Sequence, residues 1–201
     1  VGTGEHGLVR IGIGDWSDGI VPKTGPLAAL AVEKGESVPN TQMAIAILPR
    51  IAELIRSRDA ALAAEIESRV EGYRVAMASA WTGEFFHRAY FGDGNPVHAD
   101  QIDLEAQVWG LIGNTFSEPG QRQALIERIA EQLDEPSPMG ATMIPGGGVW
   151  PAISGLLSWG YASTDPERAW AHLGRNTMAA HARAFPEVWY GIWSGPDGVS
   201  S

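Results

Sequence analysis

The residues best suited to chemistry lie near the N-terminus, where two aspartates flank a tryptophan among glycines, in Gly12-Ile13-Gly14-Asp15-Trp16-Ser17-Asp18-Gly19. Aspartate is seldom buried without a partner, and glycine lets the backbone around the acids turn freely. An indole beside carboxylates suits a sugar, because the ring packs on C–H groups while the acids hold hydroxyl groups or a glycosidic oxygen. A turn capped by Asp and Ser side chains accounts for the same residues. The motif alone therefore leaves both interpretations open.

Composition and charge narrow the class of protein. The chain has 201 residues, of which 44% are hydrophobic and 19% charged, so it can bury a core and is not typical of a disordered chain. A net charge of −10 argues against nucleic acid or an anionic membrane surface as a partner. The absence of cysteine excludes a thiolate metal site and fits a reducing compartment, so we expect a cytoplasmic protein without a metal. No apolar run is long enough to cross a bilayer.

Both ends of the sequence are rich in residues typical of a site. The aspartate motif begins close to Val1, and the chain stops soon after Trp193 and Asp197. A self-contained domain usually has dispensable ends. We therefore expect residues 1–201 to be part of a single domain in a longer enzyme.

Apolar residues at steps of three or four predict about six helices, paired as hairpins between long loops rich in Gly, Pro and Trp. Strand signals are weak and short. We expect residues 21–39 to form a long loop holding one strand or helical turn. We expect the first helix to start at Asn40 or Thr41, with Pro49 kinking or restarting it, and the second to run from the cap Asp59 to Trp81. The third should span residues 102–114, and the fourth should run from Ser117 to Leu133. The fifth should span residues 150–161, and the sixth should follow the cap Asp165 and contain Thr177 and His181.

Three stretches, in order and spacing, resemble the catalytic barrel of glycoside hydrolase family 94, the cellobiose and chitobiose phosphorylases and related cyclic β-1,2-glucan synthase domains. Residues 12–19 are similar to the family's Gly-Asp-Trp-Asn-Asp-Gly signature, with Ser17 in place of Asn. Residues 86–94 resemble its Arg-Ala-Tyr-Phe-Asp-Asp-Gly segment, and residues 106–112 its Ala-Gln-x-Trp-x-x-Ile/Leu helix. The resemblance implies an all-α fold, an (α/α)6 barrel, of which this chain supplies about the C-terminal half.

The resemblance also implies a mechanism. Asp18 corresponds to the general acid of the family, and Asp15 and Trp16 to residues of the sugar site. Asp18 would protonate the glycosidic oxygen of a β-linked di- or oligosaccharide while inorganic phosphate attacks the anomeric carbon from the opposite face. Because phosphate is already a nucleophile, this inverting phosphorolysis needs no second carboxylate and no cofactor beyond the phosphate co-substrate.

One stretch departs from the family pattern. Family members commonly carry Arg-Glu-Asn-Gly-Gly-x-x-x-His in a loop that contributes to phosphate binding, and the matching residues here are 144–152. Pro145 replaces the acid and Ala152 replaces the histidine. The phosphate pocket is therefore different, supplied elsewhere or absent.

Four further residues are candidates for the site. His181 replaces the missing phosphate ligand or, as we prefer, caps carbonyl groups at a helix end. Arg88 contacts substrate or forms an ion pair with Glu84 that orders its loop. Gln107 reaches a sugar hydroxyl or makes a hydrogen bond between helices. Asp197 faces the site as a second carboxylate or, as we prefer, belongs to a turn with the preceding proline.

Three hypotheses follow for function. A disaccharide phosphorylase is the leading one, with the oligosaccharide and phosphate as partners, and with the rest of its own barrel or a second copy as a further partner. An inverting hydrolase or transglycosylase is the second, and it requires a carboxylate opposite Asp18, for which Asp197 is the candidate. A non-catalytic glycan-binding barrel is the third.

Overall fold

Helices dominate the protein, as predicted from the apolar periodicity. The computed structural model describes residues 2–15, 17, 20–22, 25–189 and 197–199. The elements in chain order are α1 (Pro26–Lys34), β1 (Glu36–Ser37), α2 (Val38–Ile55), α3 (Ala60–Ala76), β2 (Ala89–Tyr90), α4 (Leu104–Gly113), α5 (Gln121–Ile129), α6 (Pro151–Ala162), α7 (Pro166–Arg175), α8 (Met178–Ala184) and α9 (Pro186–Trp189). Within those ranges, no helix combines the length and the apolar character needed to cross a bilayer.

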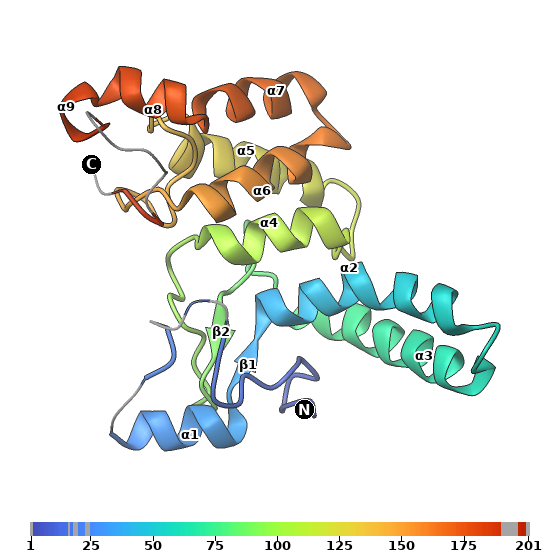
Figure 1. Cartoon of the computed structure of the whole chain (residues 1–201). Coiled ribbons are helices and arrows are strands. Elements are labelled where there is room, and N and C mark those ends of the chain that lie inside the picture. Colours follow the sequence, from blue (N-terminus) through green and yellow to red (C-terminus); the bar gives the residue numbers. More distant parts are fainter. Residues whose placement is uncertain (1, 16, 18–19, 23–24, 190–196, 200–201) are drawn as a thin grey trace.

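The helices α2 and α3 form a hairpin that extends away from the rest of the chain (Figure 1). The α2 helix begins earlier than predicted, because the Ser37 side chain caps it by accepting a hydrogen bond from the Asn40 backbone at 3.2 Å. Pro49 lies inside α2, so the predicted restart was wrong. Asp59 caps α3 as predicted, with its Oδ1 2.9 Å from the Leu62 nitrogen.

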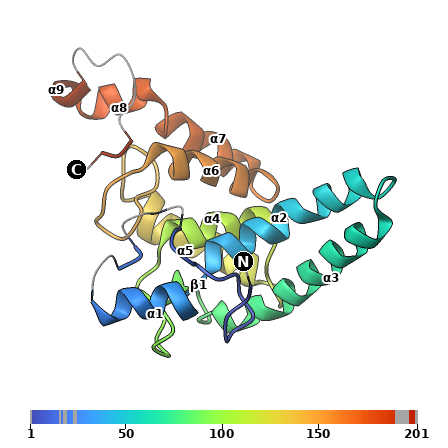
Figure 2. The ribbon, with the colours of Figure 1, turned by 60° about the horizontal axis from the view of Figure 1, so that its bottom comes forward.

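The α4 helix lies at the centre of the molecule, between α2 on one side and α6 on the other (Figures 1 and 2). Most of its residues are buried, which fits its largely apolar sequence. The largest hydrophobic cluster surrounds it, with contributions that include Ile45 of α2, Leu111 of α4 and Leu157 of α6. A second helical hairpin, α6 with α7, covers this core on the side away from α2.

Two further predictions about helices were wrong. The loop expected over residues 21–39 contains the nine-residue helix α1, which starts with Pro26 in its first turn. The single helix expected after Asp165 is divided into α7 and α8. The division occurs because the Thr177 side chain caps α8, accepting a hydrogen bond from the Ala180 backbone at 3.2 Å.

A small antiparallel pairing brings distant segments to one place. The strands β1 and β2 pair with Glu36 opposite Tyr90 and Ser37 opposite Ala89. The N-terminal segment runs along the other side of β1, where the Ile11 nitrogen donates to the Gly35 carbonyl at 2.8 Å. As a result, the segment that leads into the aspartate motif lies beside the aromatic segment that contains β2.

Candidate active site

A buried ion cluster joins the aspartate motif to β1, β2 and α4. Arg88 donates from Nε to Glu105 Oε2 at 2.8 Å and from Nη1 to Asp15 Oδ2 at 3.3 Å, and its Nη2 also contacts both carboxylates. Ser37 donates its hydroxyl hydrogen to Asp15 Oδ2 at 2.6 Å. The Asp15 and Arg88 side chains are 0% exposed. The cluster therefore anchors the aspartate motif, through Asp15, to the small sheet formed by β1 and β2.

The two carboxylates of this cluster differ in pKa. Burial raises the pKa of Glu105 to about 7, and the charge of Arg88 only partly opposes this effect. Burial acts in the same direction on Asp15, but hydrogen bonds and charge from Arg88, together with hydrogen bonds from Ser37 and Ser17, leave its pKa below the ordinary value. Asp15 is thus a fixed negative charge near neutral pH, whereas Glu105 exchanges a proton there.

A cavity of about 380 Å³ lies directly beside this cluster. Its walls come from the aspartate motif, from the segments that follow β2, from the start of α4 and from the loop before α6. The described residues that line it are Ser17, Ile20, Phe91, Val97, His98, Asp103, Glu105, Met143 and Trp150. Aromatic surface next to carboxylates is the combination that binds a sugar ring.

The acidic groups of the cavity sit at the start of α4. Asp103 is the residue that precedes the helix, and its Oδ2 lies 2.8 Å from His98 Nδ1. Glu105 follows in the first turn, and its side chain is 3% exposed. In the described part of the lining, Asp103, Glu105 and His98 are the titratable side chains, and no lysine or arginine is present.

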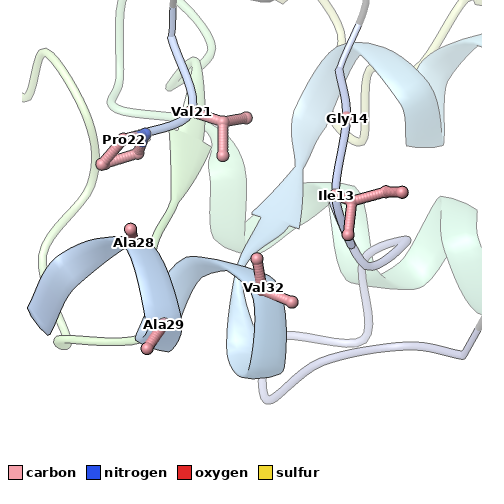
Figure 3. A pocket seen from close by; sticks show the side chains of 7 residues that line it. All are labelled: Ile13, Gly14, Val21, Pro22, Ala28, Ala29 and Val32. Carbon is pink, nitrogen blue, oxygen red and sulfur yellow. The ribbon is translucent and has the colours of Figure 1, made fainter. Parts of the chain in front are cut away.

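A larger cavity of about 650 Å³ lies between α1 and the segments on either side of the aspartate motif. Its described lining consists of Ile13, Gly14, Val21, Pro22, Ala28, Ala29 and Val32, whose side chains are shown in Figure 3. None of these residues can transfer a proton or bind a charge. The smaller cavity is therefore the candidate active site.

The structure places the predicted site residues as follows. Asp18 and Trp16 lie outside the described residues, but Ser17 and Ile20 on either side of Asp18 line the candidate cavity. The predicted ion pair between Glu84 and Arg88 was wrong, because Glu84 pairs with Arg128 at 2.6 Å.

Arg88 and Gln107 are both buried and engaged by the protein. Gln107 is 0% exposed, and its Oε1 accepts from the Phe86 nitrogen at 2.8 Å. Its Nε2 donates to the carbonyls of Phe86 and Asp103 at 2.9 and 2.8 Å. Both amide hydrogens are thus used, and Gln107 holds the aromatic segment against α4; its printed partners lie in that segment and in the cap of its own helix, so the expected hydrogen bond between helices was wrong.

His181 and Asp197 are not among the described residues that line the cavity, although Gly198, next to Asp197, lies close to Trp150 of the lining. His181 is 1% exposed, and its Nε2 lies 2.8 Å from the Met139 carbonyl, so the ring joins α8 to the loop before α6 and does not cap its own helix. Asp197 is exposed. Its segment returns to the glycine-rich loop, where the backbones of Val199 and Val149 pair at 2.8 and 2.9 Å.

A second buried cluster has the composition of a catalytic triad but not its geometry. His172 Nδ1 lies 2.7 Å from Asp134 Oδ1, and Arg175 contacts the same carboxylate at 2.5 Å. His172 Nε2 lies 2.6 Å from the Ser154 carbonyl and 3.4 Å from its hydroxyl. Because Ser154, His172 and Asp134 are at most 1% exposed, they tie α6 and α7 together and offer no access to a substrate.

Sequence reasoning missed Asp103 and Glu105. The available signal was a pair of acidic residues at the start of an otherwise apolar helix, where buried carboxylates require a partner. His98 was also missed, and its backbone has a φ of 52°, in the left-handed region. No group of three or more His, Asp or Glu residues in the described ranges is placed to hold a metal ion.

The fold and the cavity define an all-α protein of paired helices with an acidic, aromatic-walled site of the kind that accommodates carbohydrate. A family model described as "Glycosyl hydrolase 94 superfamily, catalytic domain" matches residues 2–145. The chain belongs to this family, whose catalytic domain is an (α/α)6 barrel, as the sequence motifs predicted. A search of curated proteins found no match. The family supports a carbohydrate-active enzyme.

Proposed function

We propose that this chain catalyses the cleavage of β-glycosidic bonds in a di- or oligosaccharide. The reaction inverts the configuration of the anomeric carbon, and Asp18 is the general acid. One observation carries the proposal. The residues on both sides of Asp18 line a cavity whose other walls bring together aromatic rings and two carboxylates. A protonated Asp18 delivers its proton to the glycosidic oxygen as the bond to the anomeric carbon breaks.

The neighbouring residues have supporting roles in this proposal. Trp16 offers its ring to the sugar, as the family resemblance implies. The Asp15 side chain is 0% exposed and is held by Arg88 and Ser37. Asp15 and Arg88 therefore position the segment that carries Asp18, and they do so from beneath the cavity without contacting the sugar.

Phosphate is the nucleophile that family membership favours, because members are commonly phosphorylases. A specific observation favours water as the second candidate. The described lining holds Asp103 and Glu105 but no lysine or arginine. Two unit charges about 4 Å apart near a protein surface interact by about 4 kcal/mol, so a phosphate dianion beside either ionised carboxylate meets a repulsion of several kcal/mol.

Incubation of the full-length protein with β-linked glucosides, with and without phosphate, tests the proposal. Cleavage that falls by about 10²–10⁴-fold in Asp18→Asn is the expected result, since a general acid contributes about that much to the rate. The identity of the product, sugar 1-phosphate or free sugar, separates phosphorolysis from hydrolysis. Unchanged activity in Asp18→Asn, or no turnover of any β-glucoside, would instead support a non-catalytic glycan-binding barrel.

A further inference from the structure

We propose that His98 binds a hydroxyl group of the sugar substrate through its Nε2 atom, and that Asp103 is the positioning residue that holds the His98 ring. This inference rests on the proposed function, since it takes the cavity beside Asp15 and Arg88 as the place where the saccharide lies. His98 thereby contributes to the choice of substrate, whichever nucleophile attacks the anomeric carbon.

One nitrogen of the His98 ring is held by the protein, and the other is left for a ligand. Nδ1 lies 2.8 Å from Asp103 Oδ2. Because a carboxylate only accepts hydrogen bonds, Nδ1 carries the hydrogen, and Asp103 fixes both the tautomer and the direction of the ring. Nε2 makes no hydrogen bond to the residues that the structure describes. The His98 side chain is 44% exposed and lines the cavity, so Nε2 is accessible to a molecule there.

Asp103 holds this ring from a position where its side chain ordinarily caps a helix. It is the residue immediately before α4, and an aspartate at that position usually accepts a hydrogen bond from a backbone N–H of the first turn. The Asp103 side chain makes no such bond and pairs with His98 instead. The Leu104 nitrogen at the start of the helix donates to the Met143 carbonyl at 2.9 Å. The Asp103 side chain is only 7% exposed, so the carboxylate that orients His98 is itself held in place by its surroundings.

The backbone of His98 adopts an uncommon conformation as well. Its φ of 52° lies in the left-handed region, which residues other than glycine seldom occupy. The other such residue in the described ranges is Asn114, which ends α4, and a left-handed residue is usual at that place. His98 lies in a turn and ends no helix. Unusual backbone conformations of this kind gather at sites that bind ligands.

A sugar hydroxyl is the group that fits Nε2 best. A neutral ring accepts a hydrogen bond at Nε2, and a protonated ring donates one. A hydroxyl group can donate and can accept, so it pairs with Nε2 in both states, whereas an anionic oxygen pairs with the protonated ring alone. The carboxylate on Nδ1 also makes Nε2 a stronger acceptor. Asp103 and Glu105 belong to the same wall as His98, and they favour an uncharged ligand over an anion beside the ring.

Three variants of the full-length protein separate the roles of the two ring nitrogens. His98→Gly removes the ring, and glycine adopts the left-handed backbone without strain. His98→Asn tolerates the same backbone and keeps a donor for Asp103 near the position of Nδ1, but it has no atom near the position of Nε2. We expect kcat/KM for the disaccharide to fall about 10-fold in both variants, as for the loss of one hydrogen bond. His98→Gln places its amide near the position of Nε2 and should retain part of the activity.

The matched control is Asn114→Gly. It changes the other left-handed residue, which is exposed and lies at the far end of α4 from Asp103. We expect this variant to match the wild type.

Substrates that lack single hydroxyl groups identify the contact. Cellobiose, laminaribiose, sophorose and their monodeoxy forms are assayed with wild type and His98→Gly in the presence of phosphate, and their Kd values are measured by calorimetry. At one position we expect removal of the hydroxyl to weaken the wild type but to cause no further loss in His98→Gly. At the other positions both proteins should lose equally. Such coupling between one hydroxyl and one side chain does not arise from a merely structural role.

Three outcomes would overturn the assignment of His98. One is wild-type kcat/KM in His98→Gly or in His98→Asn. Another is an equal loss in wild type and His98→Gly for every deoxy sugar. The third is a rise in KM confined to phosphate, which would make His98 a phosphate ligand. If the wild type binds a disaccharide without cleaving it, the proposed function fails and the Kd values decide on His98; if it neither binds nor cleaves any of them, both proposals fail.

Discussion

Replacement of Glu105 by glutamine should change how the stability of the protein depends on pH. Glu105 is buried against Arg88 at the start of α4, and its pKa is raised from the ordinary value of 4.5 to about 7. Glutamine has nearly the same shape and still offers an oxygen to Arg88, but it does not titrate. The variant therefore isolates the contribution of one ionisation.

The sign and size of the effect follow from the direction of the pKa change. The folded protein holds the Glu105 proton more tightly than the unfolded chain, so this group favours folding fully below pH 4.5, and that contribution is lost as the pH rises through about 7. Each tenfold change in proton affinity corresponds to about 1.4 kcal/mol. The contribution lost by the wild type between pH 4.5 and 8 is therefore about 3 kcal/mol.

Urea unfolding followed by tryptophan fluorescence across pH 4–8 measures this effect. We expect the free energy of unfolding of Glu105→Gln to rise by about 3 kcal/mol relative to the wild type as the pH increases over that range. Glu84→Gln is the matched control, because Glu84 is an exposed residue that pairs with Arg128, and its curve should follow the wild type throughout. Parallel curves for wild type and Glu105→Gln would refute the reasoning, since they would mean that Glu105 has the same proton affinity in both states.

Two further predictions concern buried charges. Arg88→Met removes the guanidinium that contacts Asp15 and Glu105 and leaves both carboxylates buried, so we expect the free energy of unfolding at pH 7 to fall by about 3–5 kcal/mol. A loss below about 1 kcal/mol in urea unfolding would contradict this. Asp134→Asn weakens the contacts to His172 and Arg175, and we expect a loss of about 3 kcal/mol at pH 7. Burial alone would raise the pKa of Asp134, but hydrogen bonds and charge from His172 and Arg175 hold it below the ordinary value of 3.8. Its contribution is present above pH 3.8 and is lost as the pH falls through the lowered pKa, so the difference from the wild type should shrink as the pH falls below 3.8. A difference that stays constant with pH would contradict the assignment.

The helices were predictable where their signals are local. Asp59 and Asp165 each cap a helix as predicted, because a short acidic side chain before an apolar periodic run binds the free backbone N–H groups of the first turn. Thr177 shows where such reasoning fails. Threonine is compatible with both a helix interior and a cap, and here its side chain caps α8. The α1 helix was missed because its apolar run is short and lies among prolines and glycines.

The candidate site was predictable only in part, since its decisive contacts join distant positions. The aspartate motif and Arg88 were identified from their types and from the family resemblance. However, Asp15 and Arg88 are 73 residues apart in sequence, and Arg88 and Glu105 are 17 apart. No local sequence pattern indicates which carboxylate a buried arginine will contact in the folded protein. The wrong pairing of Arg88 with Glu84 arose from choosing the partner nearest in sequence.

The contacts of Arg88 give the two buried carboxylates different chemistry. Asp15 receives hydrogen bonds on both oxygens, from Arg88, Ser37 and the Ser17 backbone, and these stabilise its charge enough to lower its pKa. Glu105 shares the same guanidinium through one oxygen, and burial prevails, so its pKa rises. Environments that separate the pKa values of two neighbouring acids also separate their functions. Asp15 is suited to hold the motif in place as a fixed negative charge, whereas Glu105 gains and loses its proton near neutral pH.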